Sequence, residues 1–415
     1  MSSPGRRDIV IVGGGIIGTC TAYYLSRHPS YSPSTCSIKV IEASVNGIAQ
    51  GASGKAGGLV AKWAYPSELV NVSFPEHLKL AEEHNGKDRW GFRFVQAGSW
   101  EGSGISSSDP NANPIAQKSL EKTLGLDGSG ESVKSSIGNL TSRKAKGLPD
   151  DLTWVEEHLT EEYSDMAPAG DTAQVHPYLF TTSIMELAKE KGVQLVQGRV
   201  TSIERSNGQV SGVSYRNSDS NDAETIEATD IIIAAGAWSP SLIPSVPVDG
   251  MRAHSVTIHP DPSVTISPYA LFTSIALRGS GRPQTVTPEL YARPGNEVYA
   301  CGSGDDSPLP ETVDEVKADP AAIERVIRDA TSISSELRNG RIDKRQACFL
   351  PVVRSGGGPI VGAAPKIAKG LYVATGHTCW GICNAPGTGR AMAELVMDGK
   401  VSCTNLKKLD PARFL

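Results

Sequence analysis

Short apolar runs separated by helical patterns define the first part of the chain. Residues 9–12 are continuously apolar, which is typical of a strand that is covered on both faces in a parallel sheet. A helical pattern over residues 16–27 follows, and a second apolar strand over residues 37–41 ends in Glu42. The order strand, helix, strand predicts a βαβ unit in this region.

The rest of the chain predicts further helices and strands around a β-rich region. Alternating β-branched residues with many prolines over residues 246–302 indicate an antiparallel sheet, which we assign to a second domain. The other predicted strands cover residues 91–97, 172–175, 192–198, 200–204, 210–216, 224–230, 231–235, 345–353, 359–361 and 370–374. The other predicted helices cover residues 72–85, 154–163, 180–191, 320–337 and 388–397.

Three glycines with the spacing G-x-G-x-x-G connect the first strand to the first helix. Gly13 allows a tight turn, Gly15 lets the backbone approach a pyrophosphate, and Gly18 lets the helix pack closely on the strand. The free N–H groups and the positive dipole end of the helix N-terminus favour phosphates. Glu42 stands where the ribose hydroxyls of an adenosine would be hydrogen-bonded. An ordinary βαβ turn with a surface glutamate is the alternative interpretation.

Other glycine-rich segments also bear on a ligand site. Residues 47–65, which include Ser53 and Lys55, predict a loop with a second phosphate contact, and a flexible connector is the alternative. Residues 98–150 are rich in Gly, Ser and Asn and predict a surface insertion with a helix or two, with a lid over a substrate site as the alternative. Gly236 ends an apolar strand and indicates backbone that passes against a ligand.

Composition narrows the class of protein. A chain of 415 residues can bury a large core and predicts two domains. The net charge of −5 gives no indication of a nucleic-acid or membrane-surface partner, and no apolar run reaches the length of about 18 residues that a membrane span needs. Only seven residues precede Asp8, too few for a signal peptide. The seven irregularly spaced cysteines indicate a reducing compartment, so we expect a cytoplasmic location.

Taken together, the motifs resemble one family, the FAD-dependent amine and amino-acid oxidases grouped around D-amino-acid oxidase, glycine oxidase and monomeric sarcosine oxidase. The resemblance rests on DIVIVGGGIIG with Glu42, then GASGKAGG, the strand at Val200, IIIAAGAWS, and finally GPIVG, GLYVATGH and GTG in that order. It implies an α/β fold with a Rossmann-like FAD-binding domain and a β-rich antiparallel substrate domain. The implied segments are residues 1–95, 151–245 and 341–415 for the FAD-binding domain, 96–150 for the insertion, and 246–340 for the substrate domain, which begins within 151–245.

The resemblance also implies roles for individual residues toward FAD. Gly13, Gly15, Ile16, Ile17 and Gly18 would hold the pyrophosphate, and Glu42 the ribose. The remaining implied cofactor contacts are Ser53, Ala56 and Gly57 along the diphosphate and flavin, Val200 at the adenine, Gly236 near the ribityl and adenosine region, and Gly376, Gly387, Thr388 and Gly389 near the isoalloxazine and the last helix. The positive end of that helix would stabilise the anionic reduced flavin.

Cys348 and its surroundings set this chain apart within the family. Its place resembles that of the cysteine that carries FAD covalently in sarcosine-oxidase-like and fructosyl-amine-oxidase-like members, and a buried small hydrophobe is the alternative. Amino-acid-oxidising members have an Arg two residues later, where this chain has Leu350, and sarcosine-type members have a Lys where it has Cys383. The usual anchors for an α-carboxylate are therefore missing. Cations that could replace them are Arg354, Arg252, Lys62 and Arg293.

His377 and Trp380 follow Gly376, where the resemblance places the flavin ring. They are the candidate catalytic residues, His377 as a hydrogen-bond donor to flavin or a substrate-side base, with a structural loop histidine as the alternative. Cys379 and Cys383 have no partners at metal-ligand spacing, and no metal site is predicted.

The sequence therefore predicts an FAD-dependent oxidoreductase that oxidises a C–N bond of a small amine or amino-acid-like substrate. The resulting imine would hydrolyse, and O₂ would reoxidise the flavin. A dehydrogenase with another electron acceptor, or a flavin-binding protein with a scaffolding or trafficking role, are the alternatives.

Overall fold

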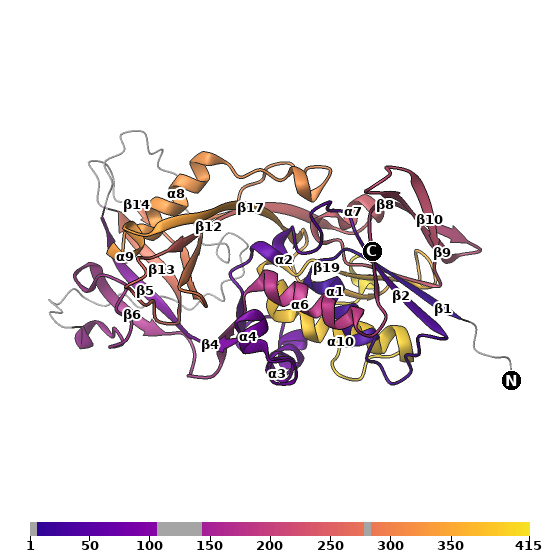
Figure 1. Ribbon diagram of the computed structural model, residues 1–415, viewed down its shortest axis with the longest axis horizontal. Coiled ribbons are helices and arrows are strands. Elements are labelled where there is room, and N and C mark those ends of the chain that lie inside the picture. The colour runs from indigo at the N-terminus through magenta and orange to yellow at the C-terminus, as the bar shows by residue number, and fades with distance from the viewer. Residues whose placement is uncertain (1–5, 106–142, 278–283) are drawn as a thin grey trace.

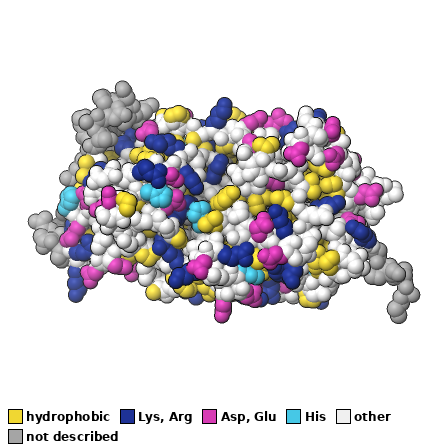
Figure 2. Space-filling view, viewed as in Figure 1, with side chains coloured by type: hydrophobic (Ala, Val, Ile, Leu, Met, Phe, Trp, Pro, Cys, Tyr) yellow, Lys and Arg dark blue, Asp and Glu magenta, His cyan; other side chains and the backbone are white. Residues whose placement is uncertain are grey.

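The computed structural model describes residues 6–105, 143–277 and 284–415. Two large sheets lie toward opposite ends of the long axis, and helices α1 (Ile16–Leu25), α6 (Pro177–Lys189) and α10 (Gly381–Asp398) pack beside one of them (Figure 1). Basic and acidic side chains are interspersed over the face that Figure 2 shows.

The first sheet has eight strands in the order β10-β9-β8-β2-β1-β11-β19-β18. Strands β8, β2, β1, β11 and β19 run parallel to one another, whereas β9 and β10 on one side and β18 on the other are added antiparallel. Their bounds are β1 Arg7–Val12, β2 Cys36–Glu42, β8 Gln194–Ser206, β9 Gln209–Asn217, β10 Ala223–Glu227, β11 Asp230–Ile233, β18 Ile360–Ala363 and β19 Leu371–Thr375. This confirms the predicted Rossmann-like arrangement.

Burial on both faces explains the apolar run of β1. Ile9 and Ile11 belong to a core cluster beneath the helices, whereas Val10 and Val12 belong to a cluster on the opposite face. Helix α1 lies close to the strand because a side chain on Gly18 would collide with the carbonyl oxygen of Gly13, as the spacing predicts. Two further helices of this region are α3 (Ser67–Glu83), which contacts α10, and α4 (Gly86–Trp90).

The second sheet has the order β17-β12-β16-β15-β13-β5-β6, with β14 paired to β13. It confirms the predicted antiparallel sheet, except that β13 and β5 run parallel. The bounds are β5 Gln96–Gly104, β6 Thr160–Asp165, β12 Val248–His259, β13 Tyr269–Leu277, β14 Gln284–Val286, β15 Glu289–Arg293, β16 Glu297–Cys301 and β17 Arg341–Val353. A small sheet of β3 (Leu59–Ala61), β7 (Thr172–Gln174) and β4 (Arg93–Phe94) completes the described β structure.

The predicted helix over residues 154–163 is wrong. The segment forms a short 3-10 turn, Glu157–Leu159, followed by strand β6. The two buried residues of that strand, Thr160 and Tyr163, are three apart because a register shift opposite Glu101 and Gly102 inserts one extra residue. A β-bulge thus produced the spacing that is normally typical of a helix.

The predicted insertion is only partly loop in the described residues. Residues 98–104 belong to β5, an inner strand of the second sheet, and residues 106–142 lie outside the described part of the chain. Glycines within β5 make room for neighbours: a side chain on Gly98 would collide with the ring of Tyr163. Glycine richness in this strand therefore reflects packing and not a loop.

Two predicted helix boundaries also change. The last helix begins at Gly381 and not at 388, although Pro386 lies inside it. The glycines that suggested a loop allow close helix packing, because a side chain on Gly389 would come within 2.7 Å of the Cys20 backbone and one on Gly387 within 2.5 Å of Ser73 Oγ. The predicted helix over 320–337 is divided into α8 (Pro320–Thr331) and α9 (Ser335–Arg338).

Candidate active site

A cavity of about 660 Å³ runs along the carboxyl ends of the central parallel strands and continues to the second sheet. Its walls come from segments far apart in the sequence, as predicted for an extended dinucleotide. The lining residues include Gly13, Gly15, Ile16, Ile17, Glu42, Ser53, Ala56, Val200, Gly236 and His377 from the predicted set. The predicted residues Gly18, Gly57, Cys348, Gly376, Trp380, Gly387, Thr388 and Gly389 are not among the lining residues.

The N-terminus of α1 forms one end of the cavity. Gly13 has φ +113°, and a side chain there would collide with the Ala234 carbonyl, so only glycine fits. The Ile16 N–H donates to Ser53 Oγ at 2.9 Å, which brings the second predicted loop against the first. Backbone N–H groups at a helix N-terminus, bordered by a hydroxyl, suit a pyrophosphate.

Gly14 positions the Glu42 carboxylate, a contact that sequence analysis missed. Its N–H donates to Glu42 Oε2 at 2.7 Å, and a side chain at this position would come within 2.6 Å of Ile48. The Ser44 N–H donates to the other oxygen, Glu42 Oε1, at 2.8 Å. These bonds fix the carboxylate in the cavity wall, where burial raises its pKa while the two bonds oppose that rise. The carboxylate can still accept hydrogen bonds from ribose hydroxyls.

A segment between β16 and α8 also lines the cavity, and no motif in the sequence predicts it. Residues 309–314, here called the strap, supply five lining residues, Leu309, Pro310, Glu311, Thr312 and Val313. The strap is held by Trp238 Nε1, which donates to the Pro310 carbonyl at 2.8 Å, and by an ion pair between Arg199 and Glu311. These contacts depend on the tertiary fold, so no local pattern predicts them.

Asp314 fastens the end of the strap to the loop after β2. Ser44 Oγ donates to Asp314 Oδ1 at 2.5 Å, and the Val45 N–H donates to Oδ2 at 3.0 Å. Asn46 Nδ2 adds a third bond to Oδ1 at 3.1 Å. Three donors on one carboxylate therefore join the strap to the segment that follows Glu42.

His377 lies at the other end of the cavity. Its Nε2 is 3.0 Å from Thr388 Oγ1, and that hydroxyl donates to the Asn384 carbonyl at 2.9 Å, so His377 Nε2–H is the donor of the pair. Burial lowers the pKa of His377 to about 3, which leaves the ring neutral at physiological pH. Such a ring is a weak base, and the geometry fits a hydrogen-bonding and positioning role better than proton abstraction. Thr388 thus acts on His377 from within α10.

The other residues predicted near the flavin ring lie behind the cavity wall. Gly376 has φ +80° and leaves room for Val353, and Gly57 leaves room for the ring of Tyr291. Trp380 packs between Trp63 and Tyr65, with ring centroids 5.7 and 5.6 Å away. Their backbone or packing roles place them one layer away from a bound ligand.

Cys348 is buried in β17 and faces an apolar cluster, whereas its neighbours Phe349, Leu350 and Pro351 line the cavity. Burial raises the pKa of the Cys348 thiol to about 11, against the opposing effect of Lys55. The thiolate that a covalent link requires is therefore scarce at neutral pH.

The four cations considered as carboxylate anchors are all engaged elsewhere. Arg293 donates to the carbonyls of residues 56 and 57 and pairs with Glu297 at 2.9 Å. The others pair with carboxylates: Arg252 with Asp305, Lys62 with Asp171, and Arg354 with Asp249. None of the four lines the cavity.

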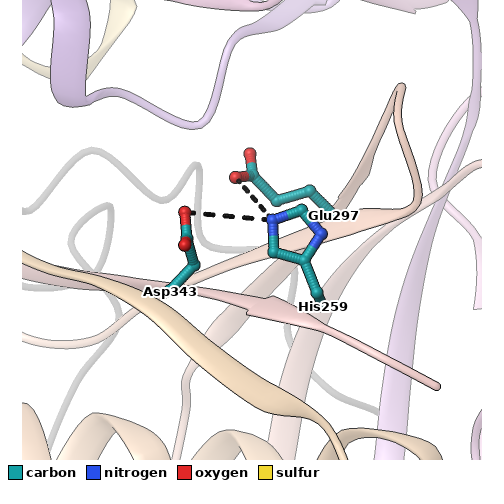
Figure 3. A group of neighbouring side chains, drawn as sticks. All are labelled: His259, Glu297 and Asp343. Carbon is teal, nitrogen blue, oxygen red and sulfur yellow. Dashed lines mark ion pairs between the residues drawn. The ribbon is translucent and has the colours of Figure 1, made fainter. Parts of the chain in front are cut away.

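Figure 3 shows a further group of titratable residues, His259, Glu297 and Asp343, at one end of the second sheet. His259 Nε2 lies 3.7 Å from Glu297 and 3.9 Å from Asp343. Each carboxylate already has an arginine partner, Arg293 on Glu297 and Arg341 on Asp343, both at 2.9 Å. Because these guanidinium groups neutralise the carboxylates, we assign no metal to this group.

Comparison with known proteins places the chain in a family. Residues 8–395 match the family described as FAD dependent oxidoreductase (DAO), and the chain belongs to it. It is 32% identical over 509 residues to "Putative oxidoreductase TDA3" of Saccharomyces cerevisiae, covering 100% of this chain and 96% of that protein. The protein is thus an FAD-dependent oxidoreductase with the family's fold.

Solved structures show the same fold at low sequence identity. Glycine oxidase from Geobacillus kaustophilus is 18% identical, with a TM-score of 0.68, covering 99% of this chain and 100% of that one. L-proline dehydrogenase from P. horikoshii is 18% identical, with a TM-score of 0.66, covering 99% and 98%. No helix in the described part of the chain is long and apolar enough to cross a membrane.

Proposed function

We propose that the protein oxidises the C–N bond of an amine or amino-acid-like substrate and passes the electrons to O₂. The observation that carries the proposal is the continuous cavity, which begins at a dinucleotide cradle of Gly13, Gly15 and Glu42 and reaches the second sheet beyond His377. FAD bound along it would place its redox-active ring at the end away from Glu42, where it would accept one hydride, that is two electrons and a proton, from the substrate carbon.

The chain's own residues contribute binding and electrostatics at that end. Gly381 and Ile382, at the N-terminus of α10, line the cavity, so the positive end of this helix faces the place where negative charge develops on reduction. The neutral ring of His377 offers polar contact without adding charge. Apolar Phe349 and Leu350 exclude water from the reacting carbon.

A second candidate is a dehydrogenase with another electron acceptor, favoured by the similarity to a structure named L-proline dehydrogenase. The similarity to a structure named glycine oxidase favours O₂. The test is to reduce the bound flavin with an amine panel under anaerobic conditions and then readmit air. The proposal predicts rapid return of the oxidised spectrum with one H₂O₂ formed per flavin. Slow return in air, together with fast return on adding a quinone, would favour the dehydrogenase.

A further inference from the structure

Residues 52–57, here called the α2 segment, form part of the cavity wall. The segment consists of the short helix α2 (Ala52–Lys55) and the two residues that follow it, and both Ser53 and Ala56 line the cavity. On the nucleotide side, Ser53 Oγ accepts a hydrogen bond from the Ile16 N–H at the start of α1. The second sheet holds the other end of the segment.

Side chains of the second sheet donate to three consecutive carbonyl oxygens of the α2 segment. Gln346 Nε2, on β17, donates to the carbonyl of residue 55 at 3.2 Å. Arg293, on β15, donates from Nη2 to the carbonyl of residue 56 and from Nε to that of residue 57 at 3.3 Å. In the reverse direction, Lys55 Nζ donates to the Ala347 carbonyl at 3.0 Å. The second sheet therefore fixes the backbone of the segment directly at the cavity wall.

Arg293 is buried, and all three of its nitrogen atoms are engaged. It is 3% exposed, and its Nη1 pairs with Glu297 at 2.9 Å. A buried cation is costly unless it is paired and hydrogen-bonded, and the planar guanidinium group can bond two carbonyls and a carboxylate at once. An apolar side chain at this position would leave the carbonyls of residues 56 and 57 without these donors.

The group in Figure 3 supplies the negative charge that Arg293 needs. Glu297 Oε1 bonds Arg293, whereas Oε2 lies 3.7 Å from His259 Nε2. Burial alone would raise the pKa of Glu297, but the adjacent guanidinium group outweighs burial and lowers it below its ordinary value. Glu297 is therefore an anion at neutral pH and orients Arg293 toward the α2 segment.

Aromatic packing holds the same backbone in a second way. A side chain on Gly57 would come within 2.1 Å of the Tyr291 ring, so the backbone lies directly on that ring. The rings of Tyr291 and Tyr299 stack with centroids 5.8 Å apart, and the guanidinium carbon of Arg293 lies 4.7 Å from the centre of the Tyr299 ring. Arg293 and the α2 segment thus contact one pair of rings, which leaves little freedom for either.

We propose that Arg293 is a positioning residue for the cofactor, because it holds Ala56 and the rest of the α2 segment in the position that bound FAD requires. The competing explanation is an ion pair that only joins the two domains. The proposal differs from it because the hydrogen bonds of Arg293 end on the backbone of a residue that lines the cavity. It does not depend on which amine is oxidised or on which acceptor reoxidises the flavin.

Arg293→Lys tests the proposal, because lysine keeps the positive charge for Glu297 but lacks the fork that bonds both carbonyls. FAD is titrated into the apoprotein, and the change in flavin fluorescence gives Kd. We expect Kd to rise about tenfold or more, the scale of losing a hydrogen bond to a charged donor. The melting temperature of the holoenzyme should also move closer to that of the apoprotein, because weaker binding stabilises the fold less. The matched control Arg341→Gln removes the exposed arginine that pairs with Asp343 in the same group, and its Kd should stay unchanged.

A role in joining the domains alone predicts a different result. Arg293→Lys would then lower the melting temperatures of apoprotein and holoenzyme by the same amount and leave Kd for FAD unchanged. That result, or an equal rise in Kd for Arg341→Gln, would overturn the inference. If Arg293→Lys does not fold, Gln346→Leu replaces it, because it removes the donor to residue 55 and leaves Arg293 in place. We expect this variant to raise Kd about threefold, the scale of one neutral hydrogen bond, and an unchanged Kd would again overturn the inference.

Discussion

The strap makes a quantitative prediction about cofactor retention. Asp314→Ala removes three hydrogen bonds to one carboxylate, from Ser44, Val45 and Asn46. Hydrogen bonds to buried charged groups contribute about 1.5–3 kcal/mol each, but Asp314 is exposed, so about 0.5 kcal/mol per bond is the appropriate scale. The total of about 1.5 kcal/mol corresponds to roughly tenfold faster release of FAD, if the bonds must break before the cofactor leaves.

Release is measured by diluting the holoenzyme and following the rise in flavin fluorescence over time. Asp306→Ala is the matched control, because Asp306 is an exposed carboxylate shortly before the strap in the chain. The affinity of the apoprotein for FAD should fall by the same factor by which the off-rate rises, because the on-rate stays similar. Identical off-rates for Asp314→Ala and Asp306→Ala would refute the reasoning that the strap retains the cofactor.

Three other predictions concern single residues. Gly13→Ala should cost more than about 3 kcal/mol of folding free energy, because it adds a side chain at φ +113° against the Ala234 carbonyl, and the variant should lose bound flavin and melt at lower temperature. Acid precipitation of the holoenzyme should leave the yellow colour in the supernatant, because burial raises the pKa of Cys348 to about 11; colour that stays with the pellet would show a covalent link. The pKa of His377 is lowered to about 3 in the folded protein, against about 6.5 in the unfolded chain. Above about pH 6.5 the ring is neutral in both states and does not reduce the free energy of unfolding. As the pH falls from about 6.5 toward about 3, only the unfolded chain takes up the proton, so stability is lost. The decrease in unfolding free energy between pH 7.5 and pH 5 should be about 2 kcal/mol smaller in His377→Gln than in the unmodified protein, by urea denaturation; equal decreases would contradict the neutral buried ring.

The nucleotide-binding end could be predicted from sequence because its signals are local. Gly13, Gly15 and Glu42 lie within one βαβ unit, and both their spacing and the apolar strands around them follow directly from backbone geometry. Later segments, such as those at Val200 and Gly236, were assigned to the same site because several motifs occur in the same order as in the family. These two residues also line the cavity.

The failures have physical causes that a single sequence does not reveal. In β6 a bulge gave Thr160 and Tyr163 the spacing of a helix. In α10 the glycines needed for contact with α1 and α3 resembled a loop. The strap contacts strands and loops that come together only in the folded protein. The composition of a segment does not show which distant segments it contacts.

The most direct test of the account is anaerobic reduction of the bound flavin by a panel of amines and α-amino acids. The account predicts that at least one amine or α-amino acid of the panel bleaches the visible absorption band of the flavin with a saturable rate, and that the product is the carbonyl compound expected from imine hydrolysis. A holoenzyme whose flavin stays oxidised with every amine and amino acid, yet is reduced by dithionite, would contradict C–N oxidation as the function.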